Sequence, residues 1–234
     1  MSGAAAPRGR DEELLLARVS AAAGRADLGR RRATYRAPRT EPGARWAAAV
    51  GAAARRLLRT GGGPVTRAGT RLDLYQRGMT AVVGRRIHVV RFDTTAVRRR
   101  RVLSSRGVTC ALELVDVDGE RVVLSRGDFG GPQEWWPGLC RAVTEAQVPR
   151  ALAALGQGAR LAFGPVWITR EEVGCGAAAL RWTGVQRVEI LDGSVAVRAA
   201  GRRQVWAAPR SGIWNLCVLH ALAEHLAAAA RDDR

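Results

Sequence analysis

The chain has 234 residues, a net charge of +17 and a hydrophobic content of 47%, which suits about two globular domains. All 38 basic residues are arginines, and such a charge favours nucleic acid, anionic lipid or acidic proteins without choosing among them. No apolar segment is long enough to span a membrane, and the first residues lack the apolar core of a signal peptide. We therefore expect a cytoplasmic protein, either free or peripheral at the inner face of the membrane.

Residues 1–69 are predicted to form a basic arm rich in Ala, Arg and Gly. Arginine outnumbers acidic residues by 14 to 5 in the first 70 positions. The apolar spacing predicts a helix over 11–24 and a second over 44–59, with an Arg/Pro/Gly-rich linker over 25–43. The arm is interpreted either as an electrostatic tether to an anionic surface or as a solvated linker.

Residues 70–148 are predicted to form a first β-rich module. Alternating residues predict strands over 72–76, 79–83 and 86–92. Asp118-Gly119 predicts a hairpin between strands over 108–117 and 120–125. A loop over 127–131 and a helix over 137–147, with Pro137 in its first turn, complete the module.

Residues 149–234 are predicted to form a second module of the same kind. A short helix over 150–155 precedes strands over 159–163, 166–170, 177–182, 185–191, 194–199 and 204–208. Asp192-Gly193 marks a second hairpin. The C-terminal helix is predicted to begin near Asn215, a favourable N-cap residue.

Two stretches, 71–97 and 160–188, share one pattern of short apolar segments ending in Arg-Phe or Arg-Trp, which indicates a doubled unit. Several motifs also make the chain similar to a bacterial family with tandem pleckstrin-homology-like (PH-like) domains: LDLYQRGM at 72–79, VRFD at 90–93, PRALAAL at 149–155, FGP at 163–165 and LRW at 180–182. The resemblance covers about 70–230. It implies an α+β, mainly β fold of two PH-like β-barrel or sandwich modules, each closed by a C-terminal helix.

Four consecutive arginines, Arg98 to Arg101, are the sharpest local feature. Successive strand residues point to opposite faces, so this run belongs on an edge strand or in a loop. With Arg85 and Arg86 it forms a candidate site for the phosphates of lipid or nucleic acid. The alternative is a solvated edge that blocks aggregation.

Trp135 and Trp136 form a candidate exposed aromatic contact. Because they are adjacent, a helix or turn should bury only one of them. The other then meets a partner or a membrane interface, or packs between module and linker.

No complete catalytic or metal motif is present. Asp128-Phe129-Gly130 lacks every other kinase feature, and His88 has no nucleophile motif beside it. The set of Asp116, Asp118 and Glu120 is interpreted as a hairpin turn, because the calcium-binding glutamate is missing. Cys217 and His220 could begin a metal site, yet a buried thiol beside a surface histidine is the simpler interpretation.

These observations favour a non-catalytic binding or scaffold protein without cofactor or metal. The expected partner is an anionic lipid surface or an unidentified protein, with no small-molecule substrate evident. One alternative is a regulatory module that binds a peptide at a sheet edge. Another is non-specific nucleic-acid binding through the arm; sequence-specific recognition has no supporting motif.

Overall fold

The computed structural model describes residues 7–36, 70–84, 86–104, 107–125, 129, 132–191, 193–199 and 202–232. The predicted helix over 44–59 and Asp128 lie outside these residues. Within them the fold is mixed α+β and mainly β, with four antiparallel sheets. None of the described helices is both long enough and apolar enough to cross a membrane.

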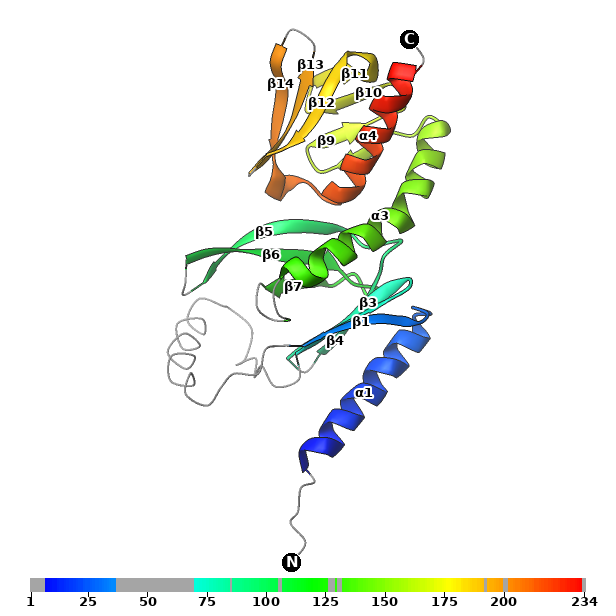
Figure 1. Cartoon of the computed structure of the whole chain (residues 1–234), viewed down its shortest axis with the longest axis vertical. Coiled ribbons are helices and arrows are strands. Elements are labelled where there is room, and N and C mark those ends of the chain that lie inside the picture. The colour runs from blue at the N-terminus through cyan, green and yellow to red at the C-terminus, as the bar shows by residue number, and fades with distance from the viewer. Residues whose placement is uncertain are drawn as a thin grey trace, which may run out of the picture.

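The first half contains a four-stranded and a three-stranded sheet followed by a long helix (Figure 1). The strand order of the four-stranded sheet is β1-β2-β3-β4, and that of the other sheet is β5-β6-β7. The bounds are β1 Arg31–Arg36, β2 Arg71–Tyr75, β3 Gly78–Val83, β4 Arg86–Arg91, β5 Val97–Ser104, β6 Gly107–Val115, β7 Arg121–Ser125 and α3 Pro132–Gly156.

The second half repeats this plan of four strands, three strands and a helix. Its sheets have the orders β11-β10-β9-β8 and β12-β13-β14. The bounds are β8 Leu161–Phe163, β9 Val166–Ile168, β10 Glu172–Cys175, β11 Ala178–Arg181, the 3-10 turn η2 Trp182–Gly184, β12 Val185–Ile190, β13 Ser194–Ala199, β14 Arg202–Pro209, the 3-10 turn η3 Arg210–Gly212 and α4 Leu216–Asp232.

The predicted linker over 25–43 is wrong in its middle part. Residues 31–36 form β1, which pairs antiparallel with β2. Thr34 donates a hydrogen bond of 2.5 Å to the buried Asp73, and Tyr35 reaches the carbonyl of Glu134 on α3 at 3.3 Å. The arm therefore adds a strand to the first sheet. A basic run that looks like a linker is stable as a strand because the neighbouring strand supplies its backbone partners.

The helix that precedes β1 is α1, Pro7–Arg25. It begins one turn earlier than predicted, because proline is well suited to the first helical position. Its buried residues Val19, Ala22 and Ala23 lie on the side that faces the first sheet, and the helix contacts β3 and β4. Figure 1 shows it beneath that sheet, at the end of the molecule away from the second half.

The two helices predicted over 137–147 and 150–155 are one continuous helix, α3. It contains Pro137 and Pro149 in its interior, where proline normally ends or kinks a helix. Packing compensates for the lost backbone bond, since Leu139, Val143 and Leu155 are all fully buried. The second half also contains one strand, β10, that the alternation of residues did not predict.

Both hairpins were predicted correctly. Glu120 and Asp118 donate their backbone amides to the Asp116 carboxylate, at 2.8 and 3.1 Å, and Gly119 has φ +80°, as a tight turn requires. β12 and β13 pair across the second turn.

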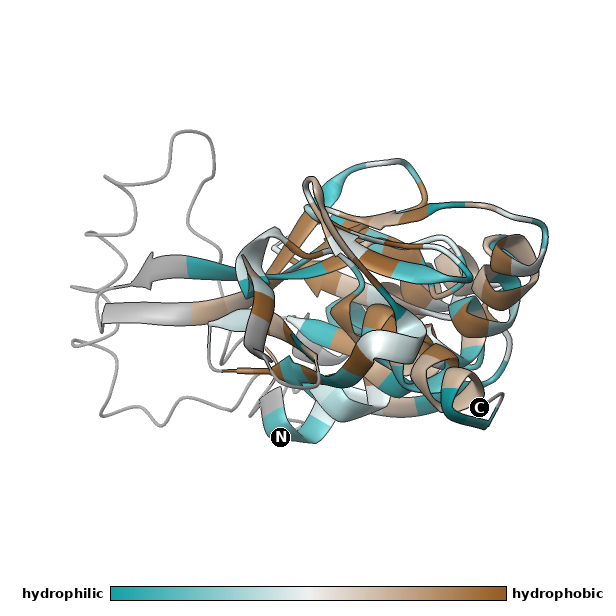
Figure 2. Cartoon of the chain, turned by 90° about the horizontal axis from the view of Figure 1, so that it is seen from above, coloured by the Kyte–Doolittle hydropathy of each residue, from teal (hydrophilic) through white to brown (hydrophobic). Residues whose placement is uncertain are grey.

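The apolar core is continuous across both halves. One cluster of buried side chains includes Leu72, Phe92, Leu114, Leu139, Val166, Trp206 and Leu222. The hydrophobic residues gather inside the body of the molecule, where Figure 2 shows them brown.

Candidate functional site

The arginine run lies on β5, which is an edge strand of the three-stranded sheet, as the alternation argument predicted. Arg98 lies opposite Glu113 on β6, and Arg99 lies opposite the buried Leu112. Since side chains alternate along a strand, Arg98 and Arg100 lie on one face and Arg99 on the other. The run is thus divided between two environments.

Glu113 gathers the arginines of the first face. Its side chain is fully buried, and it contacts Arg98 at 2.8 Å, Arg121 at 3.4 Å and Arg100 at 3.7 Å. A buried carboxylate is costly unless cations or hydrogen-bond donors compensate it. Part of the positive charge predicted for anion binding is therefore already engaged inside the protein.

The first two arginines of the run, Arg98 and Arg99, each stack on a tryptophan ring. The guanidinium of Arg98 lies 4.4 Å from the ring centre of Trp214, and that of Arg99 lies 5.5 Å from Trp136. Trp136 is half-buried, so one of its ring faces is occupied by a cation. Sequence spacing gives no sign of these contacts, because the arginines lie on β5 while Trp136 lies on α3 and Trp214 just before α4.

Trp135 is not an exposed contact: its exposed fraction is 1%. Its ring packs edge-to-face on Phe129, with ring centres 6.2 Å apart. The adjacent tryptophans are thus divided as expected, one in the core and one at its margin.

The other predicted anion-binding residues are scattered. Arg85 lies outside the described residues. Arg86 is exposed and pairs with Glu120 at 2.9 Å. Arg101 is exposed, and no described carboxylate lies within ion-pair distance of it.

A pocket of about 250 Å³ opens where β5, α3, η3 and α4 meet. We call it the junction pocket, because it lies between the two halves. Its polar lining residues are Arg98, Arg99, Cys140, Arg210, Cys217 and His220, and its apolar ones include Trp136, Ile190 and Leu216. It combines cations, an aromatic ring and two thiols in one cavity.

The two cysteines of this pocket interact directly. Cys217 lies in the first turn of α4 and Cys140 on α3. A hydrogen bond from the Cys140 thiol lowers the pKa of Cys217 to about 7; burial opposes this shift, while Thr144 and the backbone amides of α4 add to it. The same interaction raises the pKa of Cys140. The pair therefore favours a thiolate on Cys217 and a proton on Cys140.

The spacing of Cys217 and His220 predicts that any metal site of this helix would begin with these two residues. His220 does line the pocket, and its ring contacts Glu224 at 3.6 Å. The actual partner, Cys140, lies in the first half of the chain. Nothing in the spacing of scattered cysteines signals such a pairing.

A second cluster lies at the first hairpin turn. His88 contacts Asp116 at 2.9 Å, and Glu120 brings a carboxylate within 4.8 Å of both. Asp116 also accepts the two turn amides, and Glu120 pairs with Arg86. These contacts agree with the predicted hairpin turn, and the Glu120 carboxylate is already paired with the guanidinium of Arg86.

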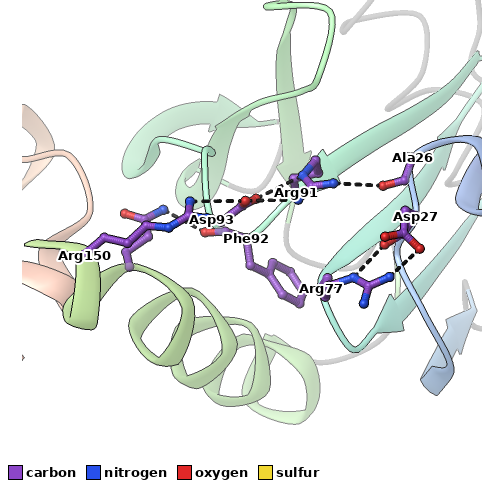
Figure 3. Close-up of polar contacts among 8 residues, drawn as sticks. Ala26, Asp27, Arg77, Arg91, Phe92, Asp93 and Arg150 are labelled. Carbon is purple, nitrogen blue, oxygen red and sulfur yellow. Dashed lines mark hydrogen bonds and ion pairs between the residues drawn. The ribbon is translucent and has the colours of Figure 1, made fainter.

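A third cluster uses the residues that carry the family resemblance (Figure 3). Arg91 holds Asp93 through two hydrogen bonds of 3.0 and 3.1 Å and reaches the Ala26 carbonyl at 3.1 Å. Arg150 on α3 contacts Asp93 at 3.3 Å, and Arg77 pairs with Asp27. These motif residues tie α1, β4 and α3 together, so their role is architectural.

This network also changes the acidity of its members. The hydrogen bond from Arg91 is the main cause that lowers the pKa of Asp93; burial opposes it, and the charges of Arg91 and Arg150 add to it. The same pairing raises the pKa of Arg91. Asp93 is thus held as a carboxylate between two elements.

Comparison with known proteins gives one family. Residues 64–232 match the model of a family of unknown function, DUF6585. No curated protein and no solved structure matches the chain. The family match extends from just before β2 to the end of α4, and thus includes both halves and the junction pocket. The chain therefore belongs to the DUF6585 family.

Proposed function

We propose that the protein is a non-catalytic binding module of two PH-like units that docks on an anionic lipid surface through the β5–β6 hairpin. Two findings support the PH-like assignment. Each half contains four strands, then three strands, then a helix, with β1 of the arm as the fourth strand of the first half, and the motifs at 72–79 and 90–93 contribute to the network that joins the first sheet to α3 and to the segment after α1. The units correspond to about 70–148 and 149–234, and residues 1–69 add a helix and a strand to the first.

The observation that carries the proposal is the exposure of Arg100 and Arg101 on an edge strand. Both are solvent-exposed, and in Figure 2 a hydrophilic stretch of the β5–β6 hairpin leaves the hydrophobic body. Guanidinium groups bind phosphate oxygens in a bidentate manner, and anionic leaflets attract clustered arginines. A charged edge also disfavours strand addition, which weighs against a peptide partner at this edge.

Co-sedimentation with vesicles tests the proposal. The vesicles are neutral or contain about 30% anionic lipid, and the salt concentration is varied. The variant R100S/R101S is preferred over replacement of the whole run, because it removes only the longest Glu113 contact, that of Arg100 at 3.7 Å, and leaves the buried Glu113 its closest cation, Arg98. With about 1 kcal/mol per arginine at the surface, this variant should bind anionic vesicles about 30-fold more weakly.

The matched control is R187S/R231S, which removes two exposed arginines from the second half. It should retain most of the binding. An equal loss in both variants would mean that net charge alone acts, and the hairpin site would be discarded. Absence of binding by the unchanged chain at low salt would overturn the lipid proposal and favour the protein-partner alternative.

A single-stranded RNA competitor separates lipid from nucleic acid. RNA that removes the protein from vesicles at stoichiometric amounts, with the same hairpin dependence, would assign the arginines to non-specific nucleic-acid binding. Retention on the vesicles supports the lipid assignment.

A further inference from the structure

The junction pocket contains a pair of thiols from the two halves. Cys140 projects from α3 and Cys217 from the first turn of α4, and both line the cavity. Each is neither fully buried nor fully exposed. The cavity, between the packed helices α3 and α4, therefore gives a small solute access to both thiols.

The surroundings stabilise negative charge on sulfur. Cys217 is at the N-terminus of a 17-residue helix, where free backbone amides and the helix dipole favour an anion. The interaction with Cys140 is the main cause that lowers the pKa of Cys217; burial opposes it, and the Thr144 hydroxyl and the backbone at the start of α4 add to the lowering. The interaction with Cys217 and burial raise the pKa of Cys140, and the positive charges of Arg99 and Arg210 oppose this rise. Exposed, low-pKa cysteines beside a second thiol are the ones that peroxides oxidise.

We propose that Cys217 and Cys140 form a peroxide-reactive dithiol site, in which Cys217 is the attacking thiolate, Cys140 is the resolving thiol, and the product is a disulfide that links α3 to α4. This site is independent of the proposed lipid surface.

The reaction balances in two steps. The Cys217 thiolate attacks one oxygen of a hydroperoxide; a sulfur–oxygen bond forms, the oxygen–oxygen bond breaks, and the alkoxide or hydroxide leaves and takes up a proton. The Cys140 sulfur then attacks the Cys217 sulfenic acid. A disulfide forms, and the hydroxide leaves as water with the proton of Cys140. In total, two thiols are oxidised to a disulfide. An organic hydroperoxide is reduced to an alcohol and one water, and hydrogen peroxide to two waters. A dithiol reductant restores the two thiols by thiol–disulfide exchange.

A metal site is less well supported by the same residues. Soft cations prefer thiolates and imidazole, and His220 lines the pocket. Within the described part of the chain, however, no third histidine, cysteine or carboxylate lies within ligand distance of both thiols. Two thiols without a third ligand favour a disulfide over a metal site.

The experiment uses the full chain, reduced, desalted and kept in a chelator. It is treated with stoichiometric hydrogen peroxide, then alkylated and mapped by mass spectrometry. We expect a Cys140–Cys217 disulfide within one molecule, while Cys110 and Cys175 remain alkylatable. Peroxide should oxidise Cys140 and Cys217 at least about tenfold faster than the exposed Cys110, measured as the rate at which each cysteine stops reacting with the alkylating agent. Dominant oxidation of Cys110 or Cys175, or disulfides only between molecules, would overturn the proposal.

Three variants separate the roles. C140S should stop at a sulfenic acid on Cys217 that dimedone traps, whereas C217S should give neither that adduct nor a disulfide. The control C110S/C175S should oxidise like the unchanged chain. Equal dimedone labelling of Cys140 in C217S would reverse the assigned roles and contradict the proposal. Should C217S fail to fold, the mapping of the unchanged chain still decides.

Discussion

Glu113 determines how much of the arginine run faces outward. Its carboxylate is buried and contacts three arginines, Arg98, Arg100 and Arg121. Three cations around one anion leave a net positive cluster, and the carboxylate of Glu113 offsets part of their mutual repulsion. Glu113 therefore stabilises the sheet and also lowers the net positive charge of the arginine cluster.

Replacing Glu113 by Gln should lower the free energy of unfolding by about 1–3 kcal/mol, because charge-assisted contacts in a buried site are lost. It should also strengthen binding to anionic vesicles, since the arginines lose their internal counter-ion. Urea denaturation and co-sedimentation measure the two effects. The control Glu120→Gln removes a surface pair with Arg86 and should cost under about 1 kcal/mol. Equal costs in the two variants would contradict this account of Glu113.

Asp93 should make stability depend on acid pH. Its pKa is lowered in the folded chain by Arg91 and by the charge of Arg150. A carboxyl group with a depressed folded pKa stabilises the fold fully above its unfolded pKa of about 3.9. This stabilisation is lost as pH falls from that value toward the folded pKa.

The measurement compares the unfolding of the unchanged chain and Asp93→Asn from pH 7 to pH 3. At neutral pH the variant should be less stable, by about 1–2 kcal/mol for a lost charge-assisted hydrogen bond. Below about pH 4 the gap should narrow. A gap that stays constant across the range would show that the charge of Asp93 does not contribute.

At the scale of elements, β1 is the clearest difference from the sequence prediction. The family match begins at residue 64, yet the first sheet takes its edge strand from residues 31–36. Its Thr34 hydrogen-bonds the buried Asp73, which is also paired with Arg71 at 2.5 Å. An edge strand that supplies a partner to a buried carboxylate belongs physically to the sheet.

A shortened chain that begins at residue 64 should therefore be less stable and should self-associate. It loses β1, which leaves the β2 edge without its partner, and it loses the packing of Leu28 on Tyr75. Thermal unfolding and size-exclusion chromatography measure both effects. A chain that begins at residue 7 is the control and should behave like the full chain. Equal stability of both shortened chains would mean that α1 and β1 are dispensable.

Local signals predicted the hairpins, because Asp118-Gly119 specifies a turn whatever surrounds it. They also limited the arginines to an edge strand or a loop, because alternation excludes a central strand, and the structure has the edge strand β5. They failed at Pro149, where tertiary packing maintains a helix that proline should end, and at Cys140, whose partner is far along the chain. Contacts of high sequence separation leave no periodic trace in the sequence.

For the whole molecule, Asn215 is the joint between the halves. It is the only asparagine of the chain and has φ +48°, a conformation that asparagine tolerates better than most residues. Its side chain accepts the Val97 amide at 2.6 Å and donates to the Gln147 side chain at 2.9 Å and the Thr95 carbonyl at 3.2 Å. The side chain of the predicted N-cap residue thus hydrogen-bonds the first half of the chain and not the amides of its own helix.

Asn215→Gly keeps the backbone conformation accessible but removes these three bonds. It should lower stability by about 1–3 kcal/mol, and it should separate the unfolding of the two halves into two calorimetric transitions. Asn215→Ala adds backbone strain and should be worse. A single transition at the original temperature in the glycine variant would show that the continuous core alone couples the halves.

Helix α3 belongs to both halves, and its second proline gives it mechanical character. Pro149 has no amide hydrogen, so the carbonyl of Glu145 lacks its helical donor, and the helix is less stiff there, as it is at Pro137. Upstream of this point the helix is anchored by Trp135 and Leu139 in the core, and downstream by Leu155. A force applied to one half is therefore transmitted to the other along a helix that bends most easily at its two prolines.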